Sequence, residues 1–163
     1  EDCPTTDEAK EAMRVYPFRS AISALMFAMV AMRADLSYVV TCIARFSANP
    51  GLPHWNALVR AYQYAKGTAD LKLTYSRMAD TPAPLMYGYS DADWATTDID
   101  ERRTCIGYCL FLSGAVILWV TRFWKPCLSS MEGELGGVTE IGLECNRLSR
   151  TDGFSSTFMA PDQ

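Results

Sequence analysis

The 163-residue sequence predicts a fold of mixed class, α+β or α/β, in which a helical N-terminal segment precedes a mixed sheet with a packed helix. Apolar residues recur at helical spacing through most of the first half of the chain. Two-residue alternation, which is typical of strands, replaces that spacing between residues 85 and 120. A helical pattern returns after the last strand, so helices and strands occupy separate parts of the chain.

The polar stretch 76–84, which contains two prolines, is the best candidate for a boundary between these parts. We expect a helical part at residues 1–75, a connector at 76–84, a sheet-and-helix part at 85–150 and an irregular tail at 151–163.

Helix signals can be followed along the first part. Thr5-Thr-Asp-Glu8 has the form of a capping box and predicts a short helix that ends near Met13. Asp35 is placed to cap a later helix. His54 stands at a helix start, where a capping or surface role competes with a role as a base or ligand. Further helices are expected at residues 18–32, 35–47 and 54–66, and a strand at residues 71–75.

The strand signals of the second part begin at residues 85–89, where Tyr87 and Tyr89 share one face. Ser113-Gly114 separates two further apolar runs, residues 104–112 and 115–120, and is a suitable two-residue hairpin turn.

Two carboxylates follow the tyrosine strand. Asp91 continues the face of Tyr87 and Tyr89 by the two-residue period, and Asp93 lies two residues further on. Carboxylate oxygens with water are the ligands that Mg²⁺ prefers. The competing interpretation is ordinary turn chemistry, because Asp also caps turns and helices.

The last helix, expected from Ser129 or Ser130 to about Ser149, carries an acid on its predicted apolar stripe. Glu134 is followed at helical spacing by Val138, Ile141, Cys145 and Leu148. Glu132 lies about 200° away around the helix and is expected to face solvent. A buried Glu needs a partner, and a metal ion shared with Asp91 would provide one. Alternatively, Glu134 lies near the first turn, where the helix dipole favours acids.

Composition argues mildly against nucleic-acid binding and more strongly against a zinc site. The net charge of −4 and the pI near 5 lack the overall electrostatic footprint of a nucleic-acid binder. The six cysteines form no Cys-x-x-Cys pair and the single histidine is remote from them in sequence, which disfavours zinc. Cys105 and Cys109 are expected as buried thiols in a reduced compartment.

No membrane segment is expected. The apolar run between Arg19 and Arg33 is too short to span a bilayer, and the opening Glu1-Asp2 carries no signal peptide. A start without Met suggests a piece of a longer product.

Three segments of the second part resemble the ribonuclease H region of copia-type retrotransposon polyproteins: Tyr89-Ser-Asp-Ala-Asp-Trp-Ala95, Arg102-Arg-Thr-Cys-Ile-Gly-Tyr108 and Leu128-Ser-Ser-Met-Glu-Gly-Glu134. The first part resembles the end of the reverse transcriptase region in the same polyproteins, on Pro17-Phe-Arg-Ser and Arg45-Phe-Ser-Ala-Asn-Pro-Gly51 among others. The resemblance covers roughly residues 3–148 and implies a partial ribonuclease H-like fold.

The resemblance implies that Asp91 and Glu134 are metal ligands and catalytic residues of an enzyme that cuts the RNA strand of an RNA–DNA hybrid. Asp93 matches a supporting position of the motif. Two Mg²⁺ ions would activate the attacking water and stabilise the leaving oxygen. The remainder of the polyprotein is the implied partner, and the cytoplasm, a virus-like particle or the nucleus is the implied location.

Departures from the family pattern argue for weak or no activity. A third acidic residue, expected after a further strand, is not recognisable in residues 151–163. Gly136-Gly137 stands where the family has helix-favouring residues, at about 1 kcal/mol each, and Gly133 replaces an alanine. The alternatives are a non-catalytic transposon remnant, or a binding module that holds nucleic acid or protein through the sheet and Arg102-Arg103.

Overall fold

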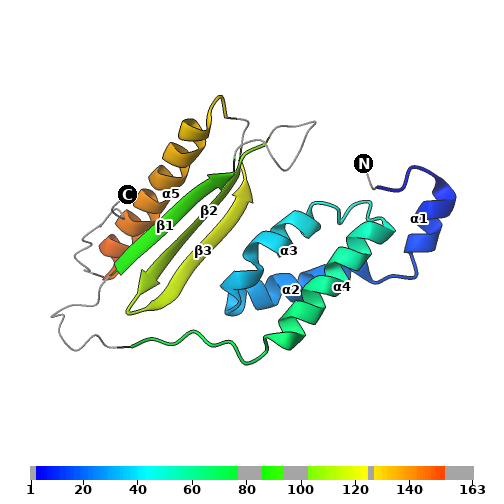
Figure 1. The fold of residues 1–163 in the computed structure, drawn as a ribbon, viewed down its shortest axis with the longest axis horizontal. Coiled ribbons are helices and arrows are strands. Elements are labelled where there is room, and N and C mark those ends of the chain that lie inside the picture. Colours follow the sequence, from blue (N-terminus) through cyan, green and yellow to red (C-terminus); the bar gives the residue numbers. More distant parts are fainter. Residues whose placement is uncertain (1–2, 77–85, 94–102, 125–126, 153–163) are drawn as a thin grey trace. The chain divides into compact units, whose positions relative to one another are not determined.

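The computed structural model describes residues 3–76, 86–93, 103–124 and 127–152 (Figure 1). The chain divides into two compact units, Glu1–Lys72 and Leu73–Gln163. The connector expected at 76–84 and the tail expected at 151–163 lie almost wholly outside the described residues.

Unit 1 is helical throughout. Its elements are α1 (Asp7–Met13), α2 (Phe18–Ala31), the 3-10 turn η1 (Ala34–Leu36), α3 (Ser37–Ala44) and α4 (Leu52–Gly67). The apolar faces of α2, η1, α3 and α4 meet in one core that contains Phe18, Ile22, Leu25, Leu36, Val40 and Leu58. The helices predicted from apolar spacing are therefore confirmed to within a few residues at each end.

Two side chains fix helix starts in unit 1. The Ala9 N–H donates to Thr6 Oγ1 at 3.3 Å, which makes Thr6 the cap of α1. The Gly51 N–H donates to His54 Nδ1 at 2.8 Å, and the imidazole stacks on Phe46 with ring centroids 3.9 Å apart. His54 is only 8% exposed, so its capping role is confirmed and a surface position is wrong.

Asp35 does not cap α3; it holds Arg33 instead. The Asp35 carboxylate accepts from Arg33 Nε at 2.9 Å and from Nη2 at 2.7 Å, and Nη2 also donates to Thr68 Oγ1 at 2.6 Å. The Arg33 side chain is 11% exposed, and its hydrogen bonds lower the pKa of Asp35. This pair ties the end of α2 to the end of α4.

Unit 2 begins with a three-stranded antiparallel sheet in the order β1-β2-β3: β1 (Met86–Asp93), β2 (Cys105–Leu112) and β3 (Ala115–Phe123). The hairpin turn has positive φ at both central positions, 51° at Ser113 and 85° at Gly114, as the predicted two-residue turn requires. Every described pairing is antiparallel, so no mixed sheet is present among the described strands.

Residues 71–75 form no strand, contrary to the prediction. They are held beside the hairpin by hydrogen bonds outside the ladder. Tyr75 Oη donates to the Val116 carbonyl at 3.2 Å, and the Ser76 N–H donates to the Ser113 carbonyl at 2.9 Å. No ladder pairing of residues 71–75 occurs among the described residues, so the alternating pattern alone did not produce a strand.

The last helix, α5 (Ser130–Asp152), packs along one face of the sheet (Figure 1). The unit 2 core lies between them and contains Ile106, Tyr108, Leu110, Ile141 and Cys145. All six cysteines are free thiols; Cys105 is buried as expected, whereas Cys109 is half-buried. Within the described part of the chain, no helix has the length and apolar character needed to cross a membrane.

Candidate metal centre

The two aspartates lie inside a paired strand and not after its end. In the β1–β2 ladder Asp91 pairs with Gly107 and Asp93 pairs with Cys105, so β1 runs four residues beyond the expected Tyr89. Hydrogen bonding to β2 extended the strand through residues whose local propensity favours a turn.

The alternation of β1 decides which face each aspartate occupies. A Cβ built on Gly133 or Gly137 of α5 would lie 3.3 Å from Ala92 Cβ or Ser90 Cβ respectively, so these two strand residues face the helix. Asp91 and the tyrosines therefore project from the opposite face. Tyr87 and Tyr89 do share that face, with ring centroids 5.9 Å apart, as predicted.

The start of α5 is fixed by a capping box. The Glu132 N–H donates to Ser129 Oγ at 3.2 Å, and the Leu128 N–H donates to the Glu132 carboxylate at 2.8 Å. Glu132 was expected to face solvent. It is instead half-buried, and its carboxylate caps the start of α5.

Glu134 is exposed, so the prediction that it lies on the buried stripe is wrong. The stripe that contacts the sheet is Gly133, Gly137, Ile141 and Cys145. At about 100° per residue, this stripe is centred about 40° from the predicted one. The prediction counted apolar side chains, whereas the closest approach of α5 to the sheet is made by glycines.

Asp91 and Glu134 lie near the same end of β1, but they do not lie on the same face of the sheet. Gly133 packs on Ala92, so Glu134 begins beside the end of β1 that carries Asp91. The Asp91 side chain, however, projects from the face away from α5. No group of three His, Cys, Asp or Glu side chains able to hold a metal occurs among the described residues. These carboxylates therefore do not fit a complete two-ion centre.

An ion pair between β3 and α5 is the polar feature that sequence reasoning missed. Arg122 lies on the helix-facing side of β3 and pairs with Glu140. Nearby, burial is the main cause that raises the pKa of Tyr108, and the charge of Glu144 adds to the rise. Arg122, a basic residue in a largely apolar strand, was the signal available in the sequence. Its partner on α5 could be identified only from the packing of the helix on the sheet.

Comparison with curated proteins finds transposon polyproteins. The chain is 39% identical over 149 residues to the retrovirus-related Pol polyprotein from transposon TNT 1-94 of Nicotiana tabacum, which covers 91% of this chain and 11% of that protein. It is 32% identical over 128 residues to the Pol polyprotein from transposon RE2 of Arabidopsis thaliana, covering 78% of this chain and 8% of that protein. The chain thus spans about a tenth of these relatives.

One relative is covered over most of its length and is named as an effector and not as a polyprotein. The chain is 35% identical over 133 residues to the secreted RxLR effector protein 161 of Plasmopara viticola, covering 81% of this chain and 91% of that protein. No family model and no solved structure matches the chain.

Proposed function

Because the chain belongs to the copia-type retrotransposon Pol polyproteins, as a fragment of one, we propose that unit 1 is the end of the reverse transcriptase region and unit 2 a partial ribonuclease H-type domain. The parent activity is hydrolysis of the RNA strand of an RNA–DNA hybrid. This chain by itself does not cleave the hybrid at an appreciable rate.

The observation that carries the proposal is the order of elements in unit 2. An acid-bearing strand, a hairpin that completes an antiparallel sheet, and a helix with an acid near its start follow one another in the order that the family resemblance requires. Asp91 and Glu134 lie near the same end of β1, and both residues are exposed to solvent.

Two structural features support the lack of activity in isolation. Asp91 and Glu134 are two carboxylates on different faces, and a two-ion centre needs further ligands to hold each ion. The outer edge of β1 has no strand partner among the described residues, so a further strand with another acid can pair there. The rest of the polyprotein is the proposed source of that strand.

The test compares this chain with a fusion in which the segment that follows the matching region in the tobacco polyprotein is added after Gln163. We expect Mg²⁺-dependent hybrid cleavage from the fusion only. Asp91→Asn and Glu134→Gln should each reduce it at least about a hundredfold, whereas Asp70→Asn, at an exposed acid of unit 1, should leave it unchanged. Cleavage that persists in both variants would contradict the assignment of these residues.

The effector relative supports a second candidate. It matches this chain over nearly its whole length, so a protein of this span is named on its own and not as part of a polyprotein. The corresponding function is a non-catalytic binding protein. Asp91→Asn and Glu134→Gln would then leave the affinity of the protein for its binding partner unchanged. This result would separate the binding protein from the nuclease.

A further inference from the structure

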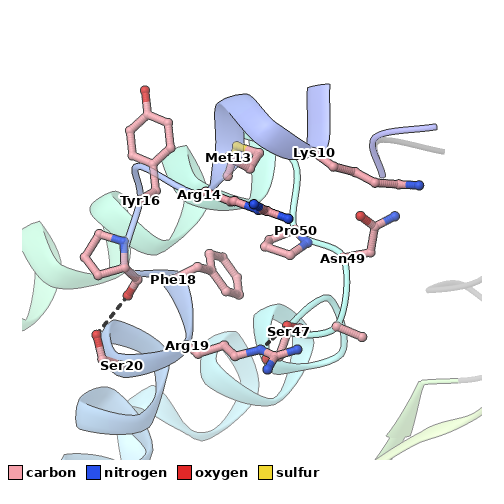
Figure 2. A pocket seen from close by; sticks show the side chains of 12 residues that line it. Lys10, Met13, Arg14, Tyr16, Phe18, Arg19, Ser20, Ser47, Asn49 and Pro50 are labelled. Atoms are coloured by element: carbon pink, nitrogen blue, oxygen red, sulfur yellow. Dashed lines mark hydrogen bonds between the residues drawn. The ribbon is translucent and has the colours of Figure 1, made fainter. Parts of the chain in front are cut away.

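Among the described residues, a hollow of about 700 Å³ in unit 1 is lined by three cations and no acid. Figure 2 shows it between the end of α1, the first turn of α2 and the loop that follows α3. Lys10 comes from α1, Arg14 directly follows α1 and Arg19 comes from α2, while Ser47 and Asn49 form the opposite wall. The lining therefore presents positive charge with polar neighbours.

The positive charge is available to a ligand. Lys10 pairs with Asp7 at 3.4 Å and Arg14 with Glu11 at 3.0 Å, but both are exposed pairs within one short helix. Such pairs contribute at most about 1 kcal/mol, so a stronger anion can displace them. Neither acid lines the hollow.

Arg19 is held in place by its own element and the loop. Its Nε donates to the Ser47 carbonyl at 3.1 Å, which fixes the guanidinium at the wall of the hollow. Within the described part of the chain, no acceptor is recorded for its two terminal nitrogens. A guanidinium anchored through Nε presents these two donors together, which suits a bidentate oxyanion.

The net negative charge of the whole chain does not reflect the charge of unit 1, where this site lies. Unit 1 carries eight Lys and Arg residues against seven Asp and Glu, whereas unit 2 carries seven against twelve. The net negative charge thus belongs to unit 2. The first turn of α2 contains no acidic residue that would oppose an anion beside Arg19.

We propose that this pocket binds a phosphate group, free or within a nucleic-acid strand, through Arg14 and Arg19 with Lys10 at its rim. Three cations around one hollow match the multiple charges and oxygens of phosphate better than a single carboxylate. Tyr16, which is half-buried at the wall, offers an apolar surface beside the anion site. The site is in unit 1 and does not depend on the carboxylates of unit 2.

The experiment titrates the full chain with a labelled 12-nucleotide poly-dT strand, with inorganic phosphate, and with a poly-glutamate peptide, over a range of salt concentrations. Arg14→Gln and Arg19→Gln should each weaken the binding of the phosphate ligand about fivefold. The double variant should reduce the salt slope for the strand by about 1.4, because each phosphate contact on a single strand contributes about 0.7. Circular dichroism checks that the variants fold.

Arg60→Gln is the matched control, because it removes the same charge from an exposed position on α4 outside this hollow. It should change affinity less than about twofold. Binding of the strand far more tightly than phosphate would identify nucleic acid as the source, and equal binding per phosphate would identify a free phosphate ligand. The proposal is overturned if no phosphate ligand binds, if Arg60→Gln weakens binding as much as Arg14→Gln and Arg19→Gln, or if poly-glutamate binds as tightly as the strand.

Discussion

Replacement of single glycines in α5 by alanine tests the packing of this helix on the sheet. Both Gly136 and Gly142 are interior helix positions, so alanine at either gains about 1 kcal/mol of helix propensity. At Gly142 no atom lies within 4 Å of the added methyl group, and Gly142→Ala should raise the free energy of unfolding of unit 2 by that amount.

At Gly136 the same methyl group would fall within 2.8 Å of three ring carbons of Trp124. Trp124 is half-buried and packs on the core of unit 2, so its ring cannot move away without disturbing that core. Overpacking of this kind costs about 1–3 kcal/mol. The propensity gain cancels between the two variants, and their difference in unfolding free energy, about 1–3 kcal/mol, measures this contact alone.

Urea unfolding followed through amide signals of β2 reports on unit 2 separately from unit 1. A double-mutant cycle with Trp124→Leu adds a second measurement, because the smaller side chain should remove most of the penalty at Gly136. Equal stability of Gly136→Ala and Gly142→Ala, with no coupling to Trp124, would refute the argument that Gly136 leaves the space that the Trp124 ring occupies against α5.

Three further predictions concern polar groups that are buried or half-buried. Asp35→Ala should lower the free energy of unfolding of unit 1 by about 2 kcal/mol, because Arg33 loses its charged partner. Since that contact lowers the folded pKa of Asp35, the wild-type advantage should be complete above about pH 4 and decline as the pH falls through the folded pKa, which urea unfolding between pH 2 and 7 would measure. Thr104→Val should stabilise unit 2 by about 1 kcal/mol, because the buried hydroxyl has no hydrogen-bond partner among the described residues; a loss of stability in a thermal scan would argue against this. His54→Ala should cost about 2 kcal/mol in thermal unfolding, because the Gly51 N–H loses its acceptor, and an unchanged midpoint would speak against the cap.

Local rules were enough to predict much of the fold. The helices of unit 1 follow from apolar spacing, and the hairpin follows from Ser113-Gly114, because two-residue hairpin turns favour small residues and glycine that accept positive φ, which both positions adopt here. The alternation that placed Tyr87, Tyr89 and Asp91 on one face also holds, since it depends only on the period of a strand.

Long-range contacts decided the rest. Strand propensity could not foresee that residues 71–75 form no ladder with a described strand or that β1 continues through Asp93, because strand formation depends on pairing with a neighbour. Gly136, which looked like a loss to the helix, instead leaves room for the ring of Trp124.

By itself, the sequence determined the family, the order of elements and the identity of the acids near the end of β1. Only the tertiary structure decided that Glu134 lies on the exposed flank of α5 and that Asp91 projects from the other side of the sheet. The physical reason is that the face a helix presents to a sheet is set by how closely the two backbones approach, and glycine, which adds nothing to an apolar stripe, permits the closest approach.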